Sequence, residues 1–365
     1  MNKKKGEHHL LILLTSFLIL TLSVGTALTQ AENQPQSTNQ PKLFGTWTFL
    51  GLEGKRVLSV AVTKHYLFAG AFDAGVYRKH LSDPTSPWEY LGFGTDQEVT
   101  ELYINPLAPD VIYLGLNYPG GLYRSDNNGD TWNQLYPPLN DEGGSYKISE
   151  ITGPKNAPET IIVTSRTTVV RSENKGETWT QLWRGQTYNI NTIAIDPSDN
   201  ARLWVGGETN MMGPFLIHSV NNGQTWIPCD LPYTGDNAVD SIAIHPKNSN
   251  IVYLGMEGKV MKTISGGLRW TMILQPLPFR YFYTLTIHPT KPNCIYAGGS
   301  ASYPYVPLDL WKSSTNGLSW SHSLEENGVN IGAIEFDYTN YNILYIGSIG
   351  SGVWQFTEIP IQDVE

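Results

Sequence analysis

Eight residues could hold a ligand, because they lie in segments that have no equivalent elsewhere in the chain. They combine three residue types: Arg56, Arg166, Arg184, Arg280, Tyr281, Tyr303, Tyr305 and Glu208. Tyrosine rings stack on sugars or side chains, and carboxylates accept hydrogen bonds. Arginines that converge on one point can grip an anionic group. This composition favours a site for a carbohydrate or a peptide, and ordinary solvated loops are the alternative.

Adjacent carboxylates suggest a second kind of chemistry, the hydrolysis of a glycoside. The chain has two such pairs, Asp141-Glu142 and Glu325-Glu326. A retaining or inverting mechanism needs two carboxyl groups facing each other across about 5 to 10 Å. The sequence does not fix this distance, so catalysis stays an alternative to simple binding.

The acidic, glycine-containing segment SDNNGDTW (125–132) could be mistaken for a calcium loop. With Gly129 at the sixth loop position, carboxylates are required where Arg124 and Leu135 stand. The spacing therefore indicates a structural turn.

The histidines and cysteines also favour structural roles. His245 and His288 occupy a strand-end position that holds Asp196 in another copy of the same pattern. Cys229 and Cys294 are too few for a four-cysteine zinc site, and we expect them in different units, too far apart for a disulfide. We expect no metal and no cofactor.

The elements that position these residues are copies of one unit. Tryptophans recur at 47, 88, 132, 179, 226, 270 and 320, with separations of 41 to 50 residues. Five copies are clear: SDNNGDTW (125–132), SENKGETW (172–179), SVNNGQTW (219–226), TISGGLRW (263–270) and SSTNGLSW (313–320). A period in the middle forties suits four short strands with their turns.

Each copy has a turn whose residues we expect to be structural. The serine and the third side chain should bond backbone amides, the glycine should adopt a positive φ, and the tryptophan should pack between units. These residues are Ser125, Asn127, Gly129, Trp132, Ser172, Asn174, Gly176, Trp179, Ser219, Asn221, Gly223, Trp226, Gly267, Trp270, Gly317 and Trp320.

Three short β-type runs precede each tryptophan, as in TIAID, RLWVG and FLIHS of one copy. One such sheet cannot bury both faces alone, so the units must stack, and a closed ring leaves no end uncovered. The sequence therefore predicts an all-β fold, a single seven-bladed β-propeller. The last unit lacks a Trp strand, so residues 47–50 should close the ring by pairing with residues 352–356.

The repeated segments resemble the Asp-box, or bacterial neuraminidase repeat, Ser/Thr-x-Asp-x-Gly-x-Thr-Trp. Proteins with this box include sialidases, sortilin-type receptors, xyloglucan-active glycoside hydrolases and photosystem II assembly and stability factors. Here the third position is Asn, Ser or Thr, which keeps the turn chemistry without the charge. The resemblance implies that the boxes lie away from a ligand-binding mouth. The mouth loops would be residues 116–121, 136–146, 208–214, 231–240, 276–283 and 300–309.

Departures from the family patterns argue against carrying over catalytic residues. A sialidase would need three convergent arginines, a Tyr/Glu nucleophile pair and an Asp acid, and the F/Y-R-I-P motif is absent near the N-terminus. Xyloglucan-active relatives place two propellers face to face, whereas this chain has one.

The N-terminus is typical of an export signal. Lys3, Lys4 and Lys5 precede the apolar run 10–28, and Thr29 and Ala31 provide small residues for cleavage. An uncleaved membrane anchor is the alternative. We expect residues 1–31 to be the signal or anchor, 32–43 a flexible linker, 44–360 the propeller and 361–365 a tail.

The net charge of the chain limits the classes of partner that it could bind. The chain carries a formal charge of −9 and its first 31 residues +2, so the rest carries −11, which argues against nucleic-acid binding. We expect a secreted or extracytoplasmic monomer that binds a protein or a carbohydrate without catalysis, nearest in blade number to the photosystem assembly factors. A basic patch like theirs does not fit this charge. A sialidase-like or glucan-active glycoside hydrolase is the alternative.

Overall fold

The computed structural model describes residues 43, 45–83, 85–117, 120–139, 147–185, 188–210, 213–232, 238–276, 280–301, 308–325 and 330–359. The chain divides into two units, Met1–Gln40 and Pro41–Glu365, and every described residue lies in the second. The predicted signal or anchor, most of the linker and the tail lie outside the described residues. Among the residues described, no helix is long and apolar enough to cross a membrane.

In the part of the chain that the structure describes, twenty-eight strands form seven four-stranded antiparallel sheets, which we call blades I to VII. Blades I and II consist of β2 (Val57–Val62), β3 (Tyr66–Ala71), β4 (Gly75–His80), β5 (Glu89–Gly92), and β6 (Val99–Ile104), β7 (Ile112–Leu116), β8 (Gly121–Ser125), β9 (Asn133–Leu135). Blades III and IV consist of β10 (Glu150–Thr152), β11 (Ile161–Thr164), β12 (Thr168–Ser172), β13 (Thr180–Arg184), and β14 (Tyr188–Asp196), β15 (Asp199–Thr209), β16 (Pro214–Ser219), β17 (Ile227–Pro228). Blades V and VI consist of β18 (Val239–Ile244), β19 (Val252–Met256), β20 (Lys259–Thr263), β21 (Thr271–Leu274), and β22 (Arg280–Ile287), β23 (Ile295–Ala301), β24 (Leu308–Ser313), β25 (Ser321–Glu325). Blade VII consists of β26 (Ile331–Phe336), β27 (Ile343–Ser348), β28 (Gly352–Glu358) and β1 (Gly45–Gly51).

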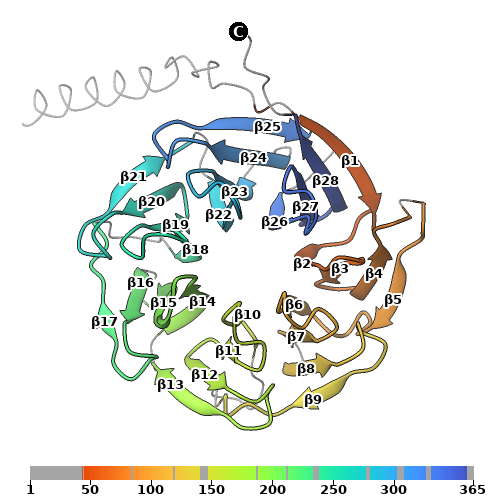
Figure 1. Ribbon diagram of the computed structural model, residues 1–365, viewed down its shortest axis with the longest axis horizontal. Helices are drawn as coiled ribbons and strands as arrows, with labels where there is room; N and C mark the ends of the chain where they lie inside the picture. Colours follow the sequence, from red (N-terminus) through yellow and green to blue (C-terminus); the bar gives the residue numbers. More distant parts are fainter. Residues whose placement is uncertain are drawn as a thin grey trace, which may run out of the picture. The chain divides into compact units, whose positions relative to one another are not determined.

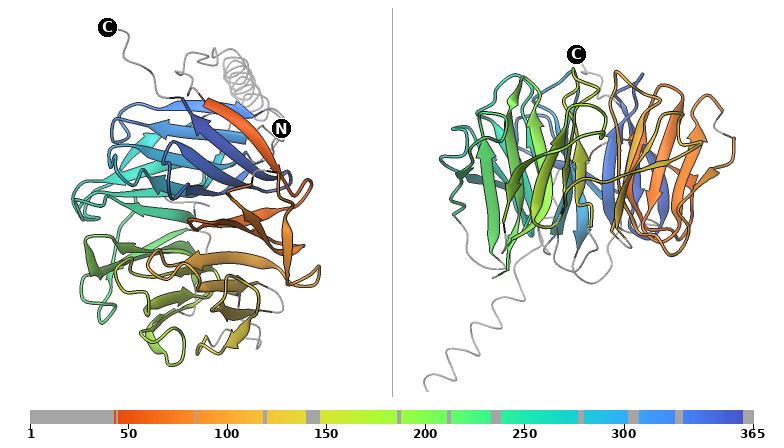
Figure 2. Two further views of the ribbon diagram at one scale, coloured as in Figure 1. Left: turned by 45° about the vertical axis from the view of Figure 1, so that its right-hand side comes forward. Right: turned by 90° about the horizontal axis from the view of Figure 1, so that it is seen from below.

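The blades stand in a ring (Figure 1). In the order given above, the first strand of each blade lies nearest the axis, so β26 is the innermost strand of blade VII and β1 the outermost. Seen from the side, the strands run from one end of the ring to the other (Figure 2). The predicted all-β, seven-bladed propeller with four strands per blade is confirmed.

The ring closes through β1, as the sequence predicted. This N-terminal strand pairs antiparallel with β28, with Trp47 opposite Phe356 and Phe49 opposite Trp354. The Trp47 indole Nε1 donates a hydrogen bond of 3.0 Å to Ser323 Oγ of blade VI. Blade VII thus combines the first and last strands of the described chain.

The core lies between blades because each sheet is apolar on both faces. Between blades II and III, for example, Tyr113 and Leu122 of one sheet form a buried cluster with Ile151 and Ile161 of the next. Face-to-face packing of this kind repeats around the ring. Every blade therefore depends on its neighbours for burial.

The five repeated turns join the third strand of a blade to its fourth strand, and they share one hydrogen-bond pattern. Ser125 Oγ accepts the Gly129 amide at 2.8 Å, and Asn127 Oδ1 accepts the Thr131 amide at 2.9 Å. Gly129 has a φ of +90°, and a Cβ there would lie 2.6 Å from Leu91 of blade I. Equivalent bonds occur at the other four turns.

A basic side chain on the third strand ties several of these turns to the neighbouring blade. Arg124 Nη1 donates a hydrogen bond of 2.7 Å to the backbone carbonyl of Lys175. Lys175 lies in the repeated turn of the next blade and has a φ of +56°. Arg78 contacts the Asn128 carbonyl in the same way, at 2.8 Å. The tryptophans also contact the preceding blade, since Trp226 Nε1 donates to the Leu182 carbonyl.

Candidate functional site

Antiparallel connectivity separates two ends of the ring. The turns from first to second strands lie at the end that holds the repeated turns, as the bond from the Asn128 amide to the Asp110 carbonyl shows. The first strands therefore begin, and the second strands finish, at the opposite end. We call this opposite end the mouth.

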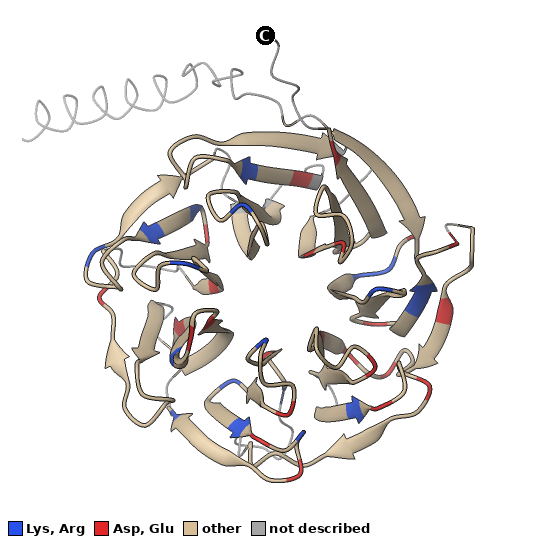
Figure 3. Cartoon of the chain, in the orientation of Figure 1, with Lys and Arg blue, Asp and Glu red and all other residues tan. Residues whose placement is uncertain are grey.

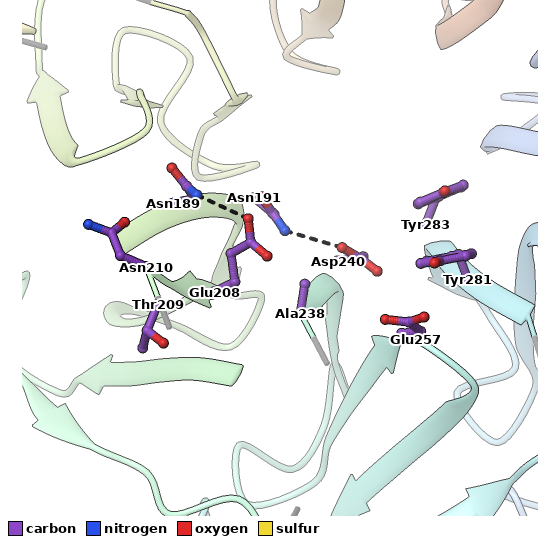
Figure 4. Close-up of a pocket in the computed structure, with 10 residues that line it drawn as sticks. All are labelled: Asn189, Asn191, Glu208, Thr209, Asn210, Ala238, Asp240, Glu257, Tyr281 and Tyr283. Carbon is purple, nitrogen blue, oxygen red and sulfur yellow. Dashed lines mark hydrogen bonds between the residues drawn. The ribbon is translucent and has the colours of Figure 1, made fainter. Parts of the chain in front are cut away.

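A cavity of about 550 Å³ opens at the mouth across blades IV, V and VI. Its lining combines amides, three carboxylates and two tyrosines: Asn189, Asn191, Glu208, Thr209, Asn210, Ala238, Asp240, Glu257, Tyr281 and Tyr283. Figure 4 shows the tyrosines on one side and Asn189 with Glu208 on the other, with Asp240 and Glu257 nearer the tyrosines. The size is that of a site for a small molecule or a few residues.

Asparagine side chains orient two of the carboxylates. Asn189 Nδ2 donates a hydrogen bond of 3.0 Å to Glu208 Oε1, and Asn191 Nδ2 donates one of 3.2 Å to Asp240 Oδ1. Arg166 Nε in turn donates 2.9 Å to Asn189 Oδ1, which fixes the amide orientation. The second oxygen of Asp240, Oδ2, is buried and has no hydrogen-bond partner among the described residues.

The carboxylates differ in their electrostatic surroundings. The pKa of Asp240 is raised to about 7, mainly by burial. The hydrogen bond from Asn191 opposes this rise, and the carboxylates Glu257 and Glu208 contribute to it. Acidic residues lie at the inner part of blades IV and V (Figure 3). At neutral pH Asp240 is therefore divided between its neutral and ionised forms.

The two tyrosines form an aromatic wall at the start of β22. Their rings stack with centroids 5.7 Å apart and an interplanar angle of 12°. Phe282 between them is buried, so the neighbours on either side present their side chains to the mouth. A hydrogen bond to Glu257 raises the pKa of Tyr281 to about 12, so this phenol stays neutral.

Basic groups lie on the blade III side of the cavity. Burial lowers the pKa of Lys147, and Arg166 lowers it further, whereas Glu98 and Glu208 act in the opposite direction. The mouth is thus basic at blade III and acidic at blades IV and V.

The structure brings together only part of the predicted set. Glu208 and Tyr281 both line the cavity, and Arg166 reaches it through Asn189. Arg56 directly precedes β2, which lies across the ring from blades IV and V (Figure 1), and its guanidinium is 4.4 Å from the Phe72 ring centroid. Arg184 ends β13 opposite Thr168, away from the cavity lining.

The remaining predicted residues give less information about the site. Arg280 begins β22, where its backbone pairs with Ala301. Tyr303 and Tyr305 lie outside the described residues. So do Asp141, Glu142 and Glu326, and Glu325 is the last residue of β25.

The predicted candidate residues did not include Asp240, Glu257, Tyr283, Asn189 and Asn191, although Asp240 and Tyr283 end the predicted mouth loops 231–240 and 276–283. These residues could have been found from the strand register of the repeated unit, because three positions of every unit lie at the mouth. The first column of positions is Arg56, Glu98, Lys147, Asn189, Ala238, Tyr281 and Asn330, and the second, two residues further on, is Leu58, Thr100, Ser149, Asn191, Asp240, Tyr283 and Gly332. The third column faces the first across the strand pair: Phe72, Asn117, Arg166, Glu208, Glu257, Ser300 and Ile349. We call these the rim positions, and they supply eight of the ten residues that line the cavity.

The chemistry open to this site is recognition or proton transfer. Within the described part of the chain, no group of three His, Cys, Asp or Glu side chains could hold a metal ion. Cys229 and Cys294 are free thiols, and burial raises the pKa of the Cys229 thiol to about 12, which disfavours a nucleophilic thiolate. His245 Nδ1 accepts the Lys247 amide at 3.2 Å, so this histidine stabilises a turn.

Comparison with known proteins shows remote sequence likeness and a shared fold. No family model matches the chain. A xyloglucanase of Hypocrea jecorina (strain QM6a) is 28% identical over 145 residues, which cover 36% of this chain and 17% of that protein. A Paenibacillus xyloglucanase is 20% identical over 271 residues, which cover 69% of this chain and 24% of that protein. The chain therefore spans about a fifth of the length of these relatives.

Two kinds of solved structure share the propeller. YCF48 bound to D1 peptide superposes with a TM-score of 0.66 at 16% identity, covering 88% of this chain and 100% of that one. The GH74 xyloglucanase of Xanthomonas campestris gives a TM-score of 0.69 at 18% identity, covering 88% of this chain and 55% of that one. The seven-bladed fold is thus shared with a peptide-binding protein and with an enzyme.

Proposed function

We propose that this protein is a non-catalytic binding propeller that recognises a segment of another protein through the mouth cavity. One observation carries the proposal: eight of the ten cavity-lining residues occupy rim positions, where the side chain differs from blade to blade. The fold does not require these side chains, so a ligand is the better reason for a cavity of this size and polarity. A propeller of the same extent, YCF48, has been seen with a peptide bound.

The same proposal covers the setting in which the protein works. The export signal or anchor places the propeller outside the cytoplasm, either secreted or held at the membrane. The five repeated turns are Asp-boxes with a structural role, and the protein acts as a monomer. Its partner is a protein, with a carbohydrate as the other ligand class.

A glycoside hydrolase is the second candidate, and a specific feature supports it. Asp240 has a pKa of about 7 and lies beside the carboxyl groups of Glu257 and Glu208, which suits a general acid with a second carboxyl group nearby. Both sequence relatives are xyloglucanases. Each of these xyloglucanases is about four to six times longer than the segment that aligns with this chain. The alignment therefore does not carry over a complete active site.

Three assays on the purified full chain test the two candidates together: a peptide array, a glycan array and a panel of fluorogenic glycosides with xyloglucan. We expect peptide binding that Glu208→Gln and Asp240→Asn weaken, with no hydrolysis. The matched control is Asp130→Asn, an exposed carboxylate at the opposite end of the ring. Hydrolysis that Asp240→Asn abolishes and Asp130→Asn preserves would replace binding by catalysis. Peptide binding that both cavity variants leave intact would remove the mouth cavity from the proposal.

A further inference from the structure

We infer that the cavity takes a basic side chain of the bound protein segment, with its cationic head beside Asp240 and Glu257 and its stem along the tyrosines. The inference rests on the proposed function and adds the chemical class of the residue recognised. It depends on three features that lie together at blades V and VI: a local excess of negative charge, a carboxylate oxygen without a donor, and an aromatic wall.

The negative charge around Asp240 is not balanced by the groups that act on it. The charged side chains that influence this carboxyl group are both carboxylates, Glu257 and Glu208. Among the described side chains, the nearby bases act on other groups than Asp240: Lys147 and Arg166 lie on the blade III side, where Lys147 interacts with Glu208, and Lys259 interacts with Glu257. A cation beside Asp240 would relieve the repulsion that the three carboxylates exert on one another.

One carboxylate oxygen lacks the donor that a basic group would supply. Asn191 satisfies Asp240 Oδ1, whereas Oδ2 is buried and has no partner among the described residues. Figure 4 shows Oδ2 turned away from Asn191, toward the side on which Glu257 and Tyr281 lie. A buried carboxylate oxygen without a donor is unfavourable, and an ammonium or guanidinium N–H would complete it.

The aromatic wall fits the rest of a basic side chain. A stacked pair of rings leaves each of Tyr281 and Tyr283 one outer face, and Tyr283 is 37% exposed at the mouth. Aliphatic stems pack against such surfaces, and cations are attracted to the faces of aromatic rings. A neutral apolar side chain would pack against Tyr281 and Tyr283 but would leave Asp240 Oδ2 without a hydrogen-bond donor.

Ionisation of Asp240 links this recognition to pH. A cation stabilises the ionised carboxylate, so binding should tighten as the pH rises through about 7. Four titratable groups face Asp240: the carboxyl groups of Glu257 and Glu208, and the phenols of Tyr281 and Tyr283, whose raised pKa values keep them neutral. Asp240 is therefore the group expected to titrate.

Two blocked tripeptides test the inference on the full chain. The first is acetyl-Gly-Arg-Gly-amide, and the second has citrulline, a neutral isostere, in place of arginine. Their dissociation constants are measured by saturation-transfer difference NMR at millimolar concentrations and at about pH 6 and about pH 8. The proteins are the wild type, Asp240→Asn and the control Asp130→Asn, which removes the same charge at the repeated turns.

We expect the arginine peptide to bind about tenfold more tightly than the citrulline peptide at the higher pH, the value of one charge-assisted hydrogen bond. This preference should shrink at the lower pH, vanish in Asp240→Asn and persist in Asp130→Asn. Equal binding of the two peptides, no binding of either, or a preference unchanged by Asp240→Asn overturns the inference. The proposed function survives those results if the array ligands still require the cavity, and it fails separately if they do not.

Discussion

Removal of the Trp47 side chain should measure how much the closing strand contributes to stability. Trp47 lies at the centre of β1, with its ring centroid 5.0 Å from that of Phe356 in β28. It packs on the cluster that joins blades VI and VII and donates a hydrogen bond to Ser323. Trp47→Ala therefore loosens β1 against both blades at once.

The magnitude follows from the burial of this side chain. Truncation of a fully buried tryptophan costs about 3 to 5 kcal/mol, and Trp47 is only partly buried, so its packing accounts for about 2 kcal/mol. Loss of the bond to Ser323 Oγ adds about 1 kcal/mol. We expect the free energy of unfolding to fall by about 3 kcal/mol.

Urea denaturation followed by circular dichroism measures the loss. Thr48→Ala is the matched control, because Thr48 lies on the same strand and its side chain is exposed, so it should change the free energy of unfolding by less than about 0.5 kcal/mol. If Trp47→Ala and Thr48→Ala unfold at the same urea concentration, closure through β1 does not stabilise the ring and the reasoning is wrong.

Three further variants test other parts of the structure by the same denaturation assay. Trp226→Ala should cost about 3 kcal/mol through lost packing and the lost bond to Leu182, without removing the mouth cavity, and an unchanged midpoint would contradict a structural role. Arg124→Met should cost about 1 to 3 kcal/mol, because the Lys175 carbonyl loses its donor, and a neutral result would show that this contact between blades is dispensable. Glu150 is half-buried, and loss of hydration raises its pKa to about 7, so the folded state holds its proton more tightly than the unfolded state and stability falls as the pH rises from about 5 to about 7. Glu150→Gln should remove the part of this fall that Glu150 contributes, leaving the parts from Glu335 and Asp240, and be stabilising by up to about 3 kcal/mol at about pH 8. A pH profile parallel to that of the wild type would refute the ionisation of Glu150.

The fold could be predicted because every unit repeats a similar pattern of short β-strands and turns. A turn closed by Ser125 and Gly129 and followed by Trp132 specifies one hairpin, and this turn recurs in five units. The regular spacing of seven tryptophans, from Trp47 to Trp320, specifies the number of units. Closure followed from a strand missing at one end and present at the other. None of these inferences needed a distance between residues far apart in the sequence.

The candidate site was less predictable because it depends on such distances. Residues were selected for their unusual segments, which found Glu208 and Tyr281 but also selected Arg56, on the opposite side of the ring. Asp240 and Glu257 are 17 positions apart and become neighbours only through the pairing of β18 with β19 and the packing of β22 on both. An alignment of the seven units by strand register, rather than by their turns, would have placed all of these residues at the mouth.

The rim positions also explain why likeness to other propellers says little about the ligand of this one. Turn residues such as Gly129 and core residues such as Val239 must satisfy the same packing in every blade, so they produce the resemblance. The rim side chains meet no such requirement, and in this chain they pass from basic at blade III through acidic at blades IV and V to aromatic at blade VI. Two propellers can therefore superpose along their whole length and present opposite charges at the mouth. Function should be compared between such proteins column by column at the rim, where this protein has Asp240, Glu257 and Tyr281.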